Sequence, residues 1–168
     1  SLSGILFSPF IHKDFSHLFN NSYPILILSS LLFLAYRSIA LQIFIWLFFI
    51  SGFWLWIIGR ESYHIGASGM IYSLAAFLFV SGLIRKNPRL AALSMIIIFL
   101  YGSLIWGVFP LKSGVSWEGH LSGLFAGVIT AIFYKDEGPK QKKYQWEIDE
   151  ELEKRVETEN EIKINYII

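Results

Sequence analysis

Residues 66–84 read GASGMIYSLAAFLFVSGLI, an apolar run without a charged side chain. A helix that crosses a membrane needs about 20 mostly apolar residues, so this run is close to the required length. Four further stretches of the same character lie before and after it along the chain. Together they predict an all-α, polytopic transmembrane helical bundle, with helices at about residues 17–36, 40–58, 67–84, 90–109 and 118–134.

The scarcity of charge before residue 135 supports this interpretation. A soluble domain carries charge on about a quarter of its residues. Residues 1–134 contain only seven basic and three acidic side chains: Lys13, Arg37, Arg60, Arg85, Lys86, Arg89, Lys112, Asp14, Glu61 and Glu118. We therefore expect a membrane domain at residues 1–134.

The basic residues between the predicted helices indicate how the bundle is oriented. Arg37 follows the first helix, residues 85–89 join the third to the fourth, and Lys135 follows the fifth. These places lie on one side because each intervening hairpin crosses the membrane twice, and the positive-inside rule makes that side cytoplasmic. The first, third and fifth helices therefore begin at the outer face.

Residues 135–168 differ from the preceding domain because they hold all the remaining acidic residues. Ile148, Leu152 and Val156 recur every four positions, which is typical of a thin amphipathic helix on a charged segment. We expect a charged cytoplasmic tail here. The formal net charge of +1 averages two unlike regions, and no nucleic-acid partner is expected.

One serine and two histidines stand at the outer starts of the first, third and fifth helices: His17, Ser68 and His120. Peptide hydrolysis by serine needs the hydroxyl, a base that accepts its proton, and donors that stabilise the oxyanion. At a helix N-terminus Ser68 has free backbone N–H groups and the positive end of the helix dipole. Gly66 lets another backbone approach. Alternatively, residues 66–69 only pack small residues between membrane helices.

His120 favours the catalytic interpretation. Histidine is costly inside a membrane segment and usually faces the bundle interior or a water-filled cavity. Gly123 and Gly127 share a helical face with His120, because they follow it by three and seven residues. This face can approach a neighbouring helix closely enough to bring the imidazole to a serine. The alternative is a histidine that only marks the membrane interface.

The motifs His17-Leu-Phe-Asn-Asn21, Gly66-Ala-Ser-Gly69 and His120-Leu-Ser-Gly123 resemble those of the rhomboid family of intramembrane serine proteases. The resemblance holds in order, spacing and residue type, and it covers residues 5–134. It implies a Ser–His dyad in which the serine of the second motif is the nucleophile and the histidine of the third is the general base.

The same resemblance implies roles for three further residues. Tyr72 is expected to pack against His120, and His17 and Asn21 are expected to join the backbone N–H of Ser68 in an oxyanion hole. The alternatives are an ordinary core tyrosine and a polar helix start that hydrogen-bonds its own loops.

Three other polar residues are given no catalytic role. We expect His12 to support the structure, His64 to be a loop or subsite residue, and Glu118 to be a solvated loop residue, so that no buried carboxylate completes a triad. The sequence has no His-Glu-x-x-His motif and no cysteine, so neither a metal site nor a disulfide is expected. No cofactor is implied.

The start of the chain departs from the family pattern. Rhomboid proteins normally begin with a further helix and a long outer loop that carries Trp-Arg, and no Trp-Arg precedes His12 here. We expect five of the usual six helices in this chain, with a further spanning helix upstream of Ser1 in the complete protein.

These features predict an intramembrane serine endopeptidase. The resemblance implies that it cleaves single-pass transmembrane proteins in or near their membrane segment. We expect a multi-pass protein of the cell membrane with its site toward the outer face. The main alternative is a rhomboid-like pseudoenzyme that binds transmembrane helices without cleavage. A channel, a transporter or an aspartyl intramembrane protease is disfavoured because no carboxylate was found within the apolar segments.

Overall fold

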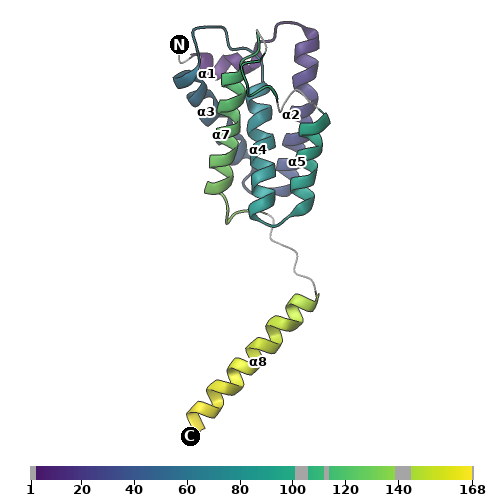
Figure 1. Ribbon diagram of the computed structural model, residues 1–168, viewed down its shortest axis with the longest axis vertical. Coiled ribbons are helices and arrows are strands. Elements are labelled where there is room, and N and C mark those ends of the chain that lie inside the picture. Colours follow the sequence, from purple (N-terminus) through teal and green to yellow (C-terminus); the bar gives the residue numbers. More distant parts are fainter. Residues whose placement is uncertain (1–2, 101–105, 112–113, 139–144, 168) are drawn as a thin grey trace.

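The computed structural model describes residues 3–100, 106–111, 114–138 and 145–167. Within these ranges the chain forms helices and connecting turns without a strand, so the prediction of an all-α bundle is confirmed (Figure 1). The elements in order are α1 (Ser3–Phe7), η1 (Ser8–Phe10), α2 (Phe15–Ala35), α3 (Ala40–Ile58), α4 (Ser68–Ile84), α5 (Pro88–Leu100), α7 (Trp117–Phe133) and α8 (Gln145–Ile167).

The observed helices agree closely with the predicted ones, with one exception. The first, second, third and fifth predicted helices correspond to α2, α3, α4 and α7, whose ends differ from the prediction by at most two residues. The fourth predicted helix, 90–109, corresponds to α5, which begins at Pro88. Residues 101–105 lie outside the described ranges, and a turn at residues 107–108 means that the helix does not continue to residue 109. The short helices α1 and η1 were not predicted.

Polar caps fix the starts of three bundle helices. The carboxylate of Asp14 accepts a hydrogen bond from the backbone N–H of His17 at 2.7 Å, at the start of α2. The Asn87 side chain accepts from Leu90 N at 3.2 Å before α5, and Ser116 Oγ accepts from the backbone of α7 at 3.2 Å. Such caps satisfy N–H groups that have no partner within the helix.

Helix α4 is the centre of the bundle, since it packs against α2, α3, α5 and α7. Its residues are apolar or small on all sides, as expected for a helix that is surrounded by others. Most of its side chains are buried, including Tyr72, Leu74, Phe77 and Leu78.

The outer surface of the bundle is apolar. Helices α2 and α3 are long and apolar enough to cross a membrane. In the most apolar 18-residue stretch of each helix, only 22% and 17% of the stretch is buried inside the protein. Large apolar side chains such as Leu26, Trp46 and Phe53 are exposed on them. A core helix of a soluble protein would bury such side chains, so this surface fits lipid.

Helix α8 lies apart from the bundle in Figure 1. The expected helix in the tail is confirmed, and α8 extends beyond the segment that the apolar spacing indicated. Ile148, Leu152 and Val156 are exposed on it.

Candidate active site

Helices α2, α4 and α7 begin at the same end of the bundle (Figure 1), which we call the site end. Their first turns carry His17, Ser68 and His120. The structure therefore gathers at one end the three residues that the sequence places at the starts of alternate helices.

Ser68 and His120 form a direct hydrogen bond, with 2.9 Å between Ser68 Oγ and His120 Nε2. The other ring nitrogen, Nδ1, lies 2.8 Å from the carbonyl oxygen of Gly107. Because a carbonyl can only accept, Nδ1 carries the proton, and the neutral imidazole has its lone pair on Nε2. Nε2 is therefore the acceptor for the serine hydroxyl, as a general base must be.

Tyr72 holds one face of the imidazole. Its ring stacks on that of His120 with centroids 4.3 Å apart and planes 16° apart. Tyr72 follows Ser68 by four residues, so both project from one face of α4. The imidazole of His120 is thus held by the stacked ring on one face and by the hydrogen bond from Nδ1 to the carbonyl oxygen of Gly107.

The close approach of α4 and α7 depends on glycines. A Cβ at Gly123 would collide with the carbonyl oxygen of Gly69, and a Cβ at Gly127 would lie 2.5 Å from the carbonyl oxygen of Ser73. No side chain larger than hydrogen fits at either position. This contact brings the start of α7 against the start of α4, where the Ser68–His120 hydrogen bond forms.

His17 and Asn21 lie against the loop that leads to Ser68. A Cβ at Gly66 would be 2.6 Å from His17 Nε2 and 3.2 Å from Asn21 Nδ2, and the φ of +96° at Gly66 is also one that favours glycine. Both nitrogens are therefore close to the backbone two residues before Ser68.

The two side chains also present donors. The backbone N–H of Lys13 donates to His17 Nδ1 at 3.4 Å, so the proton of the neutral ring is on Nε2. Asn21 is buried, and its Nδ2 has no hydrogen-bond partner among the described residues. A buried donor without a partner is costly, which is understandable if a bound group accepts its hydrogen bond.

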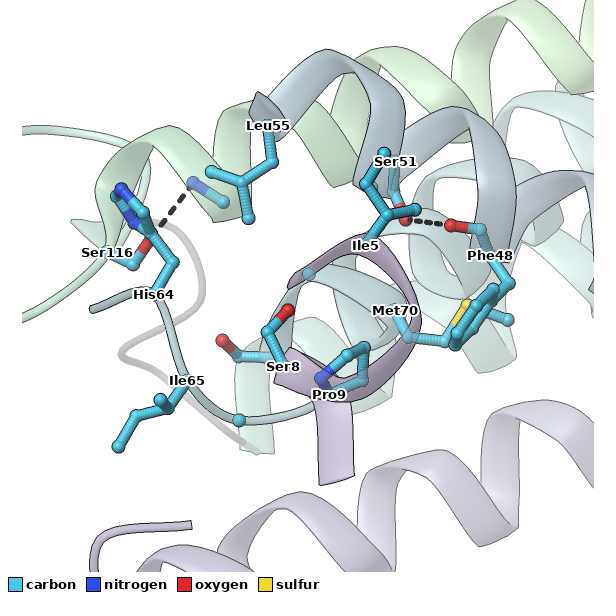
Figure 2. A pocket seen from close by; sticks show the side chains of 15 residues that line it. Ile5, Ser8, Pro9, Phe48, Ser51, Leu55, His64, Ile65, Met70 and Ser116 are labelled. Carbon is cyan, nitrogen blue, oxygen red and sulfur yellow. Dashed lines mark hydrogen bonds between the residues drawn. The ribbon is translucent and has the colours of Figure 1, made fainter. Parts of the chain in front are cut away.

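An open cleft of about 560 Å³ has His17, Ser68 and His120 in its wall. A second, much smaller cavity of about 40 Å³ also borders Ser68. Figure 2 shows this second cavity, with Ile5 and Ser8 from the chain start and His64 and Ser116 from the two loops. Ser68 is thus reachable from outside the bundle.

The expectation for Glu118 was wrong. Glu118 is only 2% exposed, and its Oε1 pairs with Arg60 Nε at 3.0 Å. The carboxylate is stable there because it is on the first turn of α7, near the positive end of the helix, with a cation opposite. Ser116 followed by an acid in the first turn is a pattern that indicates an ordered helix start, but no local pattern indicates that Arg60 is the partner.

The other two histidines, His12 and His64, lie near the site. His64 is in the loop before α4, as expected, and bonds Ser116 Oγ at 2.6 Å. The ring of His12 meets that of His17 edge to face, with centroids 5.1 Å apart. Within the described part of the chain, no group of three His, Asp or Glu side chains is placed to hold a metal ion.

The fold and these contacts define an α-helical membrane protein with a hydrogen-bonded serine and histidine at one end of its bundle. The sequence model of the Rhomboid domain family matches residues 1–137 of this chain. The chain therefore belongs to the rhomboid family, whose members are generally intramembrane proteases.

Similar proteins occur in mycobacteria. An uncharacterized protein of Mycobacterium tuberculosis and one of Mycobacterium bovis are each 36% identical over 154 residues, which is 84% of this chain and 62% of theirs. An uncharacterized protein of Mycobacterium leprae is 37% identical over 153 residues, which is 84% of this chain and 59% of that protein. The chain thus spans about three fifths of the length of these relatives. No solved structure matches it significantly.

Proposed function

We propose that the protein is an intramembrane serine endopeptidase that uses Ser68 as nucleophile and His120 as general base. The observation that carries the proposal is the 2.9 Å contact between Ser68 Oγ and the unprotonated Nε2 of His120. The hydrogen bond from Nδ1 to Gly107 O holds the ring in this tautomer, which is the part that a carboxylate plays in soluble serine proteases.

In the proposed reaction, His120 Nε2 takes the hydroxyl proton while Ser68 Oγ attacks the carbonyl carbon of the scissile peptide bond. Backbone N–H groups at the start of α4, Asn21 Nδ2 and His17 Nε2 are the candidate donors to the oxyanion. His120 then gives its proton to the leaving amine as the C–N bond breaks. A water molecule from the open cleft hydrolyses the acyl-enzyme, with His120 again as the base.

The proposed substrates are single-pass transmembrane proteins. Because the bundle surface is apolar, a transmembrane substrate can reach the site through the lipid bilayer. The cleft at the site end admits the water that hydrolysis needs. The basic residues Arg37, Arg85, Arg89 and Lys135 lie at the opposite end. By the positive-inside rule we propose that this opposite end is cytoplasmic and that the site end faces outward.

Labelling by a fluorophosphonate probe in membranes tests the proposal, because the probe reports an activated serine without a known substrate. We expect the native chain to be labelled and Ser68→Ala and His120→Ala to be unlabelled. The double variant should be no worse than either single one in cleavage of a transmembrane substrate, because the two residues act as a unit. Labelling that persists in Ser68→Ala would refute the proposal, and a folded native chain without labelling would favour the pseudoenzyme.

A further inference from the structure

The loop between α3 and α4, residues 59–67, is tied to the start of α7 by side chains that the proposed reaction does not use. Residues 61–65 of this loop have no helical structure, and the loop ends directly at Ser68. The loop therefore leads directly into the residue that carries the serine hydroxyl. His120 is on α7, the helix to which the loop is tied.

The first tie is an ion pair. Arg60 Nε lies 3.0 Å from Glu118 Oε1, and Arg60 Nη2 donates to the carbonyl oxygen of Val115 at 3.2 Å. The guanidinium is about half exposed, while the carboxylate is almost fully buried. The Arg60 side chain thus contacts both a side chain and the backbone at the start of α7.

The second tie is a hydrogen bond between His64 and Ser116. Its Nε2 donates to the carbonyl oxygen of Arg60 at 2.9 Å, so its Nδ1 accepts from the Ser116 hydroxyl at 2.6 Å. Ser116 Oγ in turn accepts from Gly119 N at 3.2 Å as the cap of α7. His64 therefore joins the loop to the cap of this helix through Nδ1, while its Nε2 bonds within the loop.

Glu118, which forms the ion pair, and His120 lie on the same first turn of α7. Successive helical residues are rotated by roughly 100°, so Glu118, two residues before His120, points to a different side of α7. One side meets the α3–α4 loop through Arg60 and the other meets Ser68 on α4. Rotation or sliding of α7 would break both contacts together.

We propose that Glu118 and Arg60 are positioning residues for the dyad. Their ion pair holds the α3–α4 loop on the start of α7, so that Ser68 Oγ and His120 Nε2 stay within hydrogen-bonding distance. The inference rests on the proposed function. An ion pair with one half-exposed partner adds little net stability, so what this pair supplies is a fixed relative position.

The test measures the rate of fluorophosphonate labelling per folded molecule in the full chain. The lead variant is Glu118→Gln, because the half-exposed Arg60 that it leaves behind can be hydrated. A displacement of 1 Å in an active site costs up to about 10²-fold, so we expect labelling to slow by roughly ten- to a hundredfold. Cleavage of a transmembrane substrate should lose kcat with little change in KM, since Glu118 is not among the residues that line the cleft.

The double variant Arg60→Gln with Glu118→Gln removes both charges and leaves neither one unpaired, so it keeps the test meaningful if a single variant folds poorly. It should label as slowly as Glu118→Gln. Arg60→Lys keeps the charge and should label faster than Arg60→Gln. Native labelling rates in Glu118→Gln and in the double variant would overturn the inference.

Arg85→Gln is the matched control. Arg85 also bonds a backbone carbonyl, that of Tyr134 at 2.7 Å, and its guanidinium lies 5.7 Å from the ring centroid of Tyr36, but at the opposite end of the bundle. It should lower thermal stability without slowing labelling per folded molecule. Equal slowing in Arg85→Gln would show a general loss of stability and overturn the positioning role. Failure of the native chain to label would instead count against the proposed function.

Discussion

The aromatic ring of Tyr72 covers one face of the His120 imidazole, with the ring centroids 4.3 Å apart and the planes 16° apart. Helix α4 therefore supplies both Ser68 and the ring that supports the His120 imidazole on the neighbouring helix. Stacked rings resist tilting of the imidazole, and tilting would move Nε2 away from the serine hydroxyl. The register of α4 against α7 thus sets the geometry of the whole site.

Replacing Tyr72 tests whether this stack matters. An aromatic pair contributes about 0.5–1.5 kcal/mol beyond burial, so Tyr72→Ala should slow probe labelling roughly two- to tenfold. Tyr72→Phe keeps the ring and should label faster than Tyr72→Ala. The measurement is the labelling rate per folded protein, and a Phe variant as slow as the Ala variant would assign the effect to the hydroxyl instead.

The helix periodicity and charge pattern were sufficient to predict most of the fold. The apolar runs predicted α2, α3, α4 and α7 to within two residues, because membrane helices need a length that is visible in the sequence. Placing Ser68 and His120 at the starts of alternate helices required only the parity of the crossings. The 2.9 Å contact between the two side chains depends on the close approach of α7 to α4, which the glycine face of α7 allows.

The parts that the sequence did not reveal depend on contacts between distant loops. Glu118 and Arg60 are 58 positions apart, and no local sequence pattern around either residue indicates that they pair. An acid close to a membrane end is normally solvated, so burial of Glu118 follows only from the fold. The carbonyl of Gly107 as partner of His120 was equally hidden, since any backbone can supply a carbonyl.

Removal of the Asn21 amide tests the oxyanion donors. Loss of one such donor in a soluble serine protease costs about 10²- to 10³-fold in kcat, and we expect a loss of that order in Asn21→Ala. Since Asn21 Nδ2 has no protein partner among the described residues, the variant should keep its thermal stability. His17→Ala should be at least as harmful to turnover, as measured by cleavage of a transmembrane substrate.

Asn20→Ala provides the control for this experiment. Asn20 is the exposed neighbour of Asn21, and its side chain donates to Ser16 Oγ at 3.5 Å. It should cleave at the native rate. A native rate in Asn21→Ala as well would mean that the polar stripe of α2 is structural.

The glycine contact between α4 and α7 predicts a steric effect. In Gly123→Ala the added methyl would meet the carbonyl of Gly69 and lie 3.0 Å from Tyr72 Cβ, so the helices must separate. Overpacking of this kind costs about 1–3 kcal/mol, which a thermal unfolding measurement detects. Labelling should also slow, because the dyad sits on the same contact.

Gly4→Ala is the matched control for Gly123→Ala, because a Cβ at Gly4 has nothing within 4 Å. Both changes add one methyl to a helix. Gly4→Ala should leave unfolding and labelling at native values. A Gly123→Ala variant that also behaves as native would show that α4 and α7 can separate without disturbing the dyad.

The orientation can be tested by labelling single cysteines, because the native chain has none. Tyr63 is 96% exposed in the loop at the site end, and Glu137 is exposed beyond α7 at the opposite end. In intact cells an impermeant thiol reagent should react with Tyr63→Cys and not with Glu137→Cys. After permeabilisation it should react with both, which shows that each position is accessible. Reaction of Glu137→Cys alone in intact cells would put the dyad on the cytoplasmic face, and the positive-inside assignment would then be wrong for this protein.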